Sequence, residues 1–171
     1  MPTLARTHLD IAGLYEAIRE GLWVYVMSIL RDSAAAEDVV HDVFAKLVDR
    51  AGREADFCPE CPRSYAYTSA RNLALNRLRD LATRRRKTSE AQPYLEWRVP
   101  PSPEDAARRA EQIAEVHAHL DRLPAEQREA LLLRTQSGLT FAEIGEVTRV
   151  PLQTAMSRYR YAVAALRKAM D

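Results

Sequence analysis

The sequence predicts an all-α protein of two small helical domains joined by a proline-rich linker. Apolar residues recur at three- and four-residue spacing through most of the chain, and sustained period-two alternation is absent. Prolines gather between residues 93 and 103, where a long helix cannot form. Two short helical patterns and a tight turn near the C-terminus predict a helix-turn-helix.

The N-terminal domain, residues 1–92, is expected to hold three helices over 8–31, 35–50 and 64–84, with a loop at 51–63. Asp32-Ser33 interrupts the first pattern, and Pro59 and Pro62 mark the loop. Two apolar stripes are expected to face the core: Val39, Val40, Val43, Phe44, Leu47 and Val48 in the second helix, and Tyr67, Ala70, Leu73, Ala74, Leu78 and Leu81 in the third.

The linker, residues 93–103, is followed by a second domain, residues 104–171. Ser102-Pro103 with two acids after it predicts a helix start, and that helix should reach Arg122. Leu123-Pro124 opens the next helix and Gly138 closes it. Thr140 and Glu143 form a capping-box pattern, and after a break at 149–151 a long helix runs from 152 to 170.

Charge is segregated along the chain, although the net charge is only +1. The range 71–87 holds seven basic residues and one acid, whereas acids collect at 37–42 and 104–129. No run approaches the roughly 18 apolar residues of a membrane span, and the N-terminus lacks the apolar stretch of a signal peptide. Two cysteines make no disulfide framework, so a cytoplasmic location is expected.

The last helix carries polar side chains suited to DNA. Gln153, Thr154, Ser157 and Arg160 share one face, and such side chains hydrogen-bond to base edges and phosphates in the major groove. The opposite face is expected to pack inward through Leu152, Ala155, Tyr159, Ala162, Val163 and Leu166. An ordinary solvated helix face is the alternative.

The basic stretch 71–87 is amphipathic and lies among aromatic and amide side chains such as Tyr65, Asn72 and Asn76. This combination suits a phosphate backbone with unstacked bases better than a membrane surface; a plain solvated face is again the alternative. The acidic face of the helix at 35–50 is expected either to serve solubility or to dock a basic protein.

Cys58 and Cys61 have the spacing of half a zinc site, which His117 and His119 could complete if the linker folds back. A redox pair is another alternative, and structural or incidental cysteines are the preferred interpretation. Motifs for phosphate loops, zinc proteases and serine hydrolases are missing from the sequence. We therefore expect a non-enzyme without cofactor or metal.

Taken together, these motifs resemble bacterial RNA polymerase sigma factors, specifically the extracytoplasmic-function type of the sigma-70 family. Residues 36–44 (AEDVVHDVF) resemble the helix that docks on the polymerase clamp, and 70–79 (ARNLALNRLR) resemble the helix that melts the −10 promoter element. Residues 123–129 and 138–144 resemble the domain that binds the −35 element.

The resemblance implies a role for each matching position, and it implies core RNA polymerase and promoter DNA as partners. Polymerase contacts would come from Asp38, His41, Asp42 and Lys46. Contacts to the −10 element would come from Tyr65, Arg71, Asn72, Asn76, Arg77 and Arg84, next to the loop 51–63, which would hold a flipped-out base. Contacts to the −35 element would come from Gln153, Thr154, Ser157, Arg158 and Arg160. Members of this family are often held inactive by an anti-sigma factor, so such a partner is also expected.

The chain departs from the family pattern in several places. Tyr65 lies where a tryptophan is usual, and Arg149 occupies the place of a turn glycine. Met156, Tyr161 and Val163 replace positions that are often basic, which makes the last helix less cationic. Two other hypotheses are a stand-alone helix-turn-helix regulator and a metal or thiol sensor acting through Cys58 and Cys61.

Overall fold

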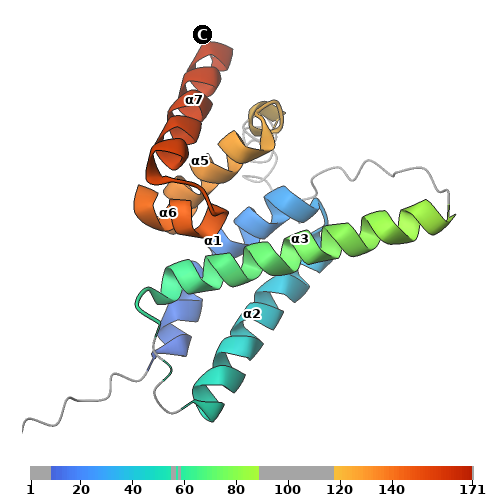
Figure 1. The fold of residues 1–171 in the computed structure, drawn as a ribbon, viewed down its shortest axis with the longest axis vertical. Helices are drawn as coiled ribbons and strands as arrows, with labels where there is room; N and C mark the ends of the chain where they lie inside the picture. The colour runs from blue at the N-terminus through green and yellow to red at the C-terminus, as the bar shows by residue number, and fades with distance from the viewer. Residues whose placement is uncertain (1–8, 55–56, 58, 89–117, 171) are drawn as a thin grey trace, which may run out of the picture.

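The computed structural model describes residues 9–54, 57, 59–88 and 118–170, and every regular element in these ranges is helical, which confirms the all-α prediction. Of the expected helix between Pro103 and Arg122, only the turn at 118–121 lies within the described residues, as helix; the linker 93–103 lies outside them. The helices are α1 (Ile11–Leu30), α2 (Ser33–Arg53), α3 (Pro62–Thr88), α5 (Ala125–Ser137), α6 (Phe141–Thr148) and α7 (Leu152–Met170) (Figure 1).

The junction between α1 and α2 is fixed by backbone geometry and a cap. Arg31 adopts the left-handed conformation (φ 58°), and its N–H donates to the Met27 carbonyl, which ends α1. The Asp32 carboxylate then accepts from the Ala35 N–H at 2.9 Å and starts α2. Two residues therefore reverse the chain, and α2 packs back against α1.

Helix α3 begins at Pro62, a favoured first helical position, and runs on to Thr88, past the expected end at Arg84. Its C-terminal part projects beyond α1 and α2 (Figure 1). The expectation that Leu78 and Leu81 face inward is therefore wrong, since both are exposed. Val48 of α2 is likewise exposed. The apolar spacing continues at these positions, but the side chains are not covered by the rest of the molecule.

The C-terminal unit contains the predicted helix-turn-helix. Gly138 ends α5 with φ 66°, and both bonds of the Thr140–Glu143 capping box open α6. Arg149 ends α6 in the left-handed conformation (φ 59°). The chain then turns closely over Gly145, where a Cβ would lie 2.8 Å from the Val150 carbonyl oxygen. Leu152, expected inside, is largely exposed at the start of α7.

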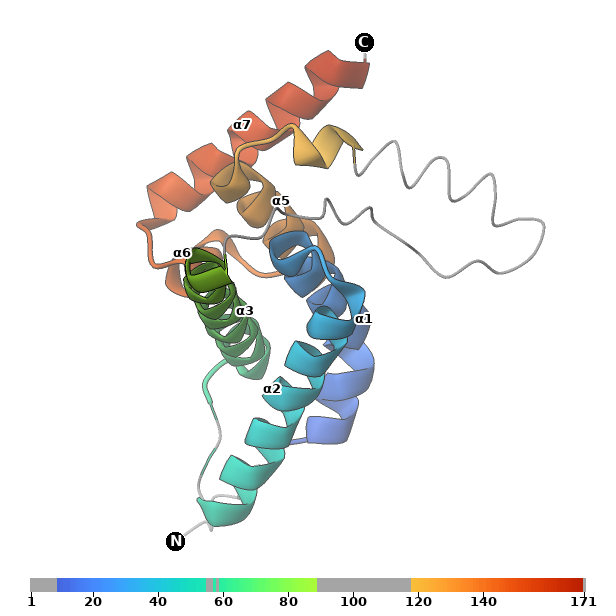
Figure 2. The ribbon, with the colours of Figure 1, turned by 90° about the vertical axis from the view of Figure 1, so that its right-hand side faces the viewer.

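The two units pack directly on each other. Helix α5 lies on α1 (Figure 2), and α6 lies on the N-terminal part of α3 (Figure 1). Buried side chains form one continuous cluster, from Leu22, Val43 and Tyr67 in the first unit to Leu133 and Ile144 in the second. None of the helices in the described ranges combines the length and apolar character needed to cross a bilayer.

Candidate polymerase and promoter interface

An aromatic and cationic cluster lies at the N-terminal end of α3, where the loop from α2 arrives. The rings of Phe57 and Tyr65 meet edge to face, with centroids 5.6 Å apart. The Arg50 guanidinium carbon lies 4.5 Å from the Phe57 centroid and 5.8 Å from that of Tyr65. Arg50 Nη1 also donates to the Tyr65 hydroxyl at 2.9 Å. We call Arg50, Phe57 and Tyr65 the aromatic cluster.

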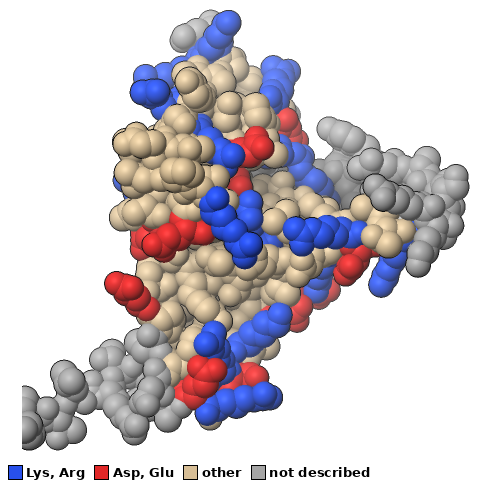
Figure 3. Space-filling view, viewed as in Figure 1, with Lys and Arg blue, Asp and Glu red and all other residues tan. Residues whose placement is uncertain are grey.

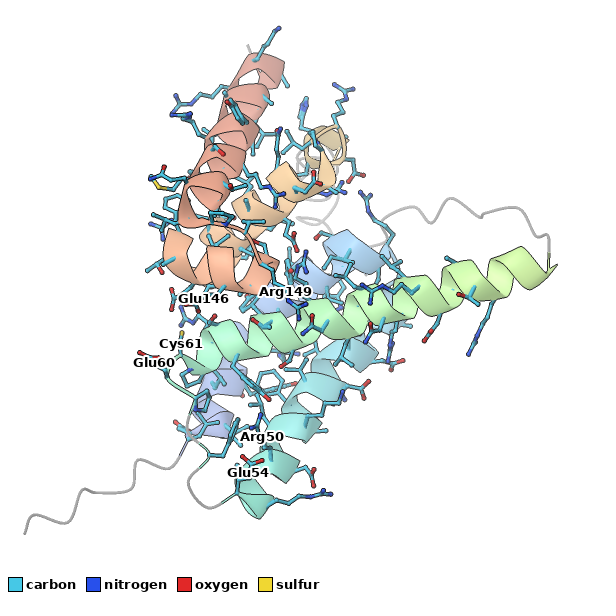
Figure 4. All side chains as sticks on the ribbon, viewed as in Figure 1. Arg50, Glu54, Glu60, Cys61, Glu146 and Arg149 are labelled. Carbon is cyan, nitrogen blue, oxygen red and sulfur yellow. The ribbon has the colours of Figure 1, made fainter. Side chains whose placement is uncertain are left out.

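Glu54 holds Arg50 from the other side, with both carboxylate oxygens 3.1 Å from Arg50 Nε (Figure 4). The hydrogen bonds to Tyr65 and Glu54 raise the pKa of the Arg50 guanidinium. Sequence analysis identified Tyr65 but missed Arg50 and Phe57. An aromatic residue within a loop expected to hold a base was the available signal for Phe57, whereas nothing in the sequence placed Arg50 beside it.

The six residues predicted to contact the −10 element lie along α3, but they differ in what they contact. Arg71 is paired with Glu129 of α5, with Nε and Oε1 2.7 Å apart. Asn76 is exposed and accepts a hydrogen bond from Arg79 at 2.8 Å. Asn72 is half-buried and Arg84 is exposed.

The sixth of these residues, Arg77, faces α2 and the predicted polymerase-docking surface. Its Nη1 lies 3.5 Å from Asp38 and donates to the Ala35 carbonyl at 3.0 Å, and its Nη2 lies 3.2 Å from Asp42. Two predicted docking residues therefore share an ion pair with a predicted promoter residue.

The predicted docking surface is the outer face of α2, on which Asp38, His41, Asp42 and Lys46 are all exposed. His41 also lines a groove of about 390 Å³ between α1 and α2, with Tyr15, Trp23 and Val40 among its apolar lining. Charged and aromatic side chains therefore lie next to one another on a single surface. Aromatic side chains such as Tyr15 and Trp23 are enriched at protein interfaces.

The face of α7 that points away from α5 and α6 carries Gln153 and Arg160, which are exposed as predicted. Thr154, Ser157 and Arg158 lie at its edge and are half-buried, and the Ser157 hydroxyl donates to the Thr154 carbonyl at 3.0 Å. Met156 is 40% exposed. The outward face is thus partly apolar, in line with the smaller number of cationic residues in this helix.

Basic and acidic side chains alternate on the surface around α3 and α6 (Figure 3). Glu146 and Arg149 lie at the end of α6, above Glu60 and Cys61 at the start of α3 (Figure 4). Arg149 occupies the left-handed turn position where the family pattern has glycine.

Polar contacts also join the two units to each other, and the sequence analysis predicted none of them. The Tyr25 hydroxyl donates to Glu129 at 2.8 Å beside the Arg71 pair. Arg63 donates to the Ser137 carbonyl at 2.8 Å, and Arg31 donates to Asp121 at 2.6 Å. The partners are far apart in sequence, 104 positions for Tyr25 and Glu129, so no local pattern predicts the pairing.

Cys61 belongs to this interface. Its thiol donates to the Glu143 carboxylate at 2.8 Å. Burial and this bond raise the pKa of the thiol, and the bonds from Cys61 and Thr140 lower the pKa of Glu143. In the described ranges, no three His, Cys, Asp or Glu side chains gather as metal ligands would, and Cys58 and His117 lie outside these ranges.

The fold and these surfaces define a class of protein: an all-α protein of two units, with a helix-turn-helix and with a basic helix beside an acidic face of α2. Residues 14–85 match the family description "Sigma-70 region 2", and residues 119–168 match "Sigma-70, region 4". The RNA polymerase sigma-H factor of Pseudomonas aeruginosa is 30% identical over 158 residues, which cover 85% of this chain and 78% of that protein.

Further relatives agree. The ECF RNA polymerase sigma factor SigC of Mycobacterium tuberculosis is 28% identical over 156 residues, covering 91% of this chain and 80% of that one. Two solved structures share the fold. The sigma factor RpoE, in complex with the anti-sigma factor NepR, from Bartonella quintana has a TM-score of 0.74 at 18% identity, covering 94% and 96% of the two chains. CnrH, in complex with the cytosolic domain of CnrY, has a TM-score of 0.63 at 22% identity, covering 94% and 87%.

The chain belongs to the sigma-70 family of RNA polymerase sigma factors, in its extracytoplasmic-function group. It is a promoter-specificity factor that binds core RNA polymerase and promoter DNA and directs transcription initiation. The resemblance inferred from the sequence is confirmed, and it is preferred over the interpretation as a stand-alone regulator.

Proposed function

We propose that the two units divide promoter recognition between them, with the first unit binding the opened −10 strand and the second binding the −35 duplex. The observation that carries this proposal is the aromatic cluster at the end of a basic helix. In this proposal, residues 1–92 recognise the −10 element and dock on the polymerase, residues 93–103 form the linker, and residues 104–171 recognise the −35 element.

The aromatic cluster offers what an unstacked base requires. Stacking on an aromatic ring contributes about 1–3 kcal/mol per base, and an arginine over the ring adds a cation–π contribution. Phe57 and Tyr65 provide the rings, and Arg50, fixed by Glu54, provides the cation. Asn72 and Asn76 follow on α3 and would hydrogen-bond to base edges or sugars of the same strand.

The −35 contacts in this proposal come from the start of α7. Gln153 lies in the first helical turn and is exposed, as is Arg160 two turns further on, and such residues reach into a major groove. Thr154, Ser157 and Arg158 would contact phosphates along the edge of the groove. With Met156 also outward-facing, apolar contact with thymine methyl groups would contribute as well.

Polymerase docking would use the exposed acids and Lys46 of α2, with His41 and the adjoining groove against α1. A basic, partly apolar helix on the polymerase side fits this surface by charge and shape. The protein would act in the cytoplasm as a non-enzymatic subunit that needs no cofactor. An anti-sigma factor, such as the NepR bound to RpoE, would regulate it.

The test is in vitro transcription with added core polymerase, together with permanganate footprinting of the −10 region. Phe57→Ala should reduce strand opening on duplex promoters about 5- to 100-fold, which corresponds to the stacking energy of one base, while polymerase association stays unchanged. Tyr65→Phe, which keeps the ring, is the matched control. Full opening by Phe57→Ala would contradict the role of the aromatic cluster.

A further inference from the structure

Arg149, which follows α6 in the turn before α7, adopts a backbone conformation that its own side chain disfavours. Its φ of 59° lies in the left-handed region, where a residue with a Cβ is strained and glycine is not. The family pattern has glycine at this place in the turn. This chain therefore carries an arginine where glycine would make the turn more stable.

Backbone contacts hold the turn around Arg149 on both sides. The Arg149 N–H donates to the Glu146 carbonyl at 3.3 Å, and the Val150 N–H donates to the Gly145 carbonyl at 2.9 Å. Val150 passes so close to Gly145 that a Cβ on this glycine would lie 2.8 Å from the Val150 carbonyl oxygen. These contacts fix the backbone of Arg149 in the left-handed conformation.

The contacts of the Arg149 side chain within the protein do not compensate for this strain. The other left-handed arginine, Arg31, donates to the Asp121 carboxylate at 2.6 Å. Arg149 is exposed, and its guanidinium has no hydrogen-bond or ion-pair partner in the part of the chain that the structure describes. Glu146 lies nearby at the end of α6 (Figure 4) but forms no ion pair with it. Backbone strain that persists in this way is found mostly at functional positions.

Arg149 lies close to the start of the helix that is proposed to enter the major groove. It precedes Gln153 by four residues, which span at most about 14 Å even when fully extended. Residues 151–153 are exposed, so both side chains open onto one continuous stretch of surface. The major groove is about 12 Å wide and is bordered on both sides by phosphates. With Gln153 in the groove, Arg149 would therefore lie beside the bordering phosphate backbone.

The outward face of α7 presents apolar side chains where cations would strengthen DNA binding. Met156, Tyr161 and Val163 occupy positions that are often basic in the family pattern, and Met156 and Tyr161 are 40% and 56% exposed. Affinity for a DNA backbone depends on the number of phosphates neutralised, because each one releases counterions. An arginine in the turn provides one more positive charge beside this helix.

We propose that Arg149 binds a phosphate of the −35 element and that its strained backbone is retained for this contact. The proposal rests on the proposed −35 role of α7, and it adds a residue that supplies affinity rather than sequence discrimination. An arginine can bind phosphate oxygens through two parallel hydrogen bonds. The turn would thus be less stable in the free protein in exchange for tighter binding of promoter DNA.

Three substitutions at this position separate the charge from the backbone strain. Arg149→Gly removes both, Arg149→Asn removes the charge but suits a left-handed turn, and Arg149→Lys keeps the charge. Arg122→Ala is the matched control, because it removes an exposed positive charge elsewhere in the second unit. Each full-length variant is assembled with core polymerase. Fluorescence anisotropy then gives its affinity for matched and scrambled −35 duplexes at several salt concentrations.

Arg149→Gly and Arg149→Asn should weaken binding to both duplexes by about eightfold at 0.1 M salt. They should also reduce the slope of log affinity against log salt by about 0.9, the contribution of one phosphate contact. Arg149→Lys should keep most of the affinity and of the slope, and Arg122→Ala should bind like the unmodified chain. In thermal unfolding, Arg149→Gly should melt at a higher temperature although it binds DNA more weakly. A residue that only shaped the turn would lose stability and binding together.

The proposal is wrong if Arg149→Gly binds with unchanged affinity and salt slope, or if Arg149→Lys or Arg122→Ala loses as much as Arg149→Gly. Gln153→Ala, measured alongside, keeps this result separate from the −35 role itself. If Gln153→Ala discriminates less between the two duplexes while Arg149→Gly binds normally, α7 reads the −35 element and only the phosphate contact is wrong. If neither variant changes binding, the proposed −35 role of α7 fails as well.

Discussion

At the residue scale, two arginines with positive φ set the path of the chain. Arg31 joins α1 to α2 and Arg149 joins α6 to α7. Arginine in the left-handed region carries a Cβ–carbonyl conflict of about 1–2 kcal/mol that glycine avoids. Arg31 is compensated by its ion pair to Asp121, but Arg149 is exposed at the end of α6. The helix-turn-helix turn is therefore a place where stability can be gained.

We expect Arg149→Gly to stabilise the protein by about 1 kcal/mol, since glycine removes the conflict but has more freedom in the unfolded chain. Gly138→Ala is the matched opposite change. With φ 66° and no closer contact than 3.4 Å, its cost of about 1 kcal/mol should come from the backbone alone. Thermal unfolding followed by circular dichroism measures both. If Arg149→Gly destabilises the protein, the arginine side chain contributes more to folding stability than its left-handed backbone conformation costs.

The Cys61–Glu143 contact predicts a pH dependence. Folding lowers the pKa of Glu143 below its ordinary value of 4.5. The contribution of Glu143 to folding stability is therefore complete above about pH 4.5 and is lost as pH falls through the lowered pKa. The pKa of Cys61 is raised from 9.0, so its contribution is complete below about pH 9 and is lost as pH rises through the raised value.

Cys61→Ala should therefore lower stability most between about pH 5 and 9, by about 1 kcal/mol. The stability difference between Cys61→Ala and the unmodified chain should shrink at lower and at higher pH. Urea unfolding over a pH series under reducing conditions measures it. A difference that stays constant from pH 3 to pH 10 would show that the contact does not titrate.

At the scale of the elements, α7 has exposed polar residues at both ends, and in the proposed −35 complex they would have different roles. Gln153 lies in the first turn, where it would reach base edges, and Lys168 lies in the last turn, where it would reach only phosphates. Base contacts distinguish sequences, whereas phosphate contacts add affinity that depends on salt. The two positions should therefore respond differently to substitution.

We expect Gln153→Ala to weaken binding to the preferred −35 sequence by about 1–3 kcal/mol and to leave non-specific binding unchanged. Lys168→Ala should weaken both by similar factors and reduce the salt slope by about one. Fluorescence anisotropy separates the two effects. It is measured for polymerase complexes on matched and scrambled −35 duplexes at several salt concentrations. Equal loss on both duplexes for Gln153→Ala would remove it from the base-contacting set.

Helix positions could be predicted because their signals are local: Asp32, Gly138 and the Thr140–Glu143 box each act within four residues. The end of α3 was missed because arginine and lysine are good helix formers and favour a helix C-terminus, so the basic run continues the helix to Thr88. Periodicity also identified the face of Leu81 but could not show that the neighbouring helices end before it.

The residues of the candidate site can be divided in the same way, into those that local sequence signals predict and those that only packing brings together. Tyr65, Gln153 and the outer face of α2 followed from residue type and spacing. Phe57 beside Arg50, and Glu129 between Tyr25 and Arg71, depend on how separate helices pack, which one sequence does not reveal.

At the scale of the whole molecule, one continuous core connects units that a long linker separates in sequence. Helix α1 is central to it, since it packs on α2, α3 and α5. Substitutions in α1 should therefore affect both units, whereas substitutions at the start of α7 should remain local.

Leu22→Ala, at a fully buried position of α1, should destabilise the protein by about 2–5 kcal/mol through lost burial and a residual cavity. Leu152→Ala removes the same atoms from a side chain that is 45% exposed and should cost under about 1 kcal/mol. Denaturant unfolding gives both values. Similar costs at the two sites would contradict the burial described for α1 and α7.

The bridge from Arg77 to Asp38 and Asp42 has a consequence for the order of assembly. In the proposed assembly, a polymerase surface that binds these two acids would take away the anions that hold Arg77, and Arg77 would then become available to DNA. By thermodynamic reciprocity, DNA that captures Arg77 must strengthen polymerase binding by the same factor. With the proposed roles of these residues, docking and promoter melting would be linked equilibria, coupled in part through the Arg77 guanidinium group.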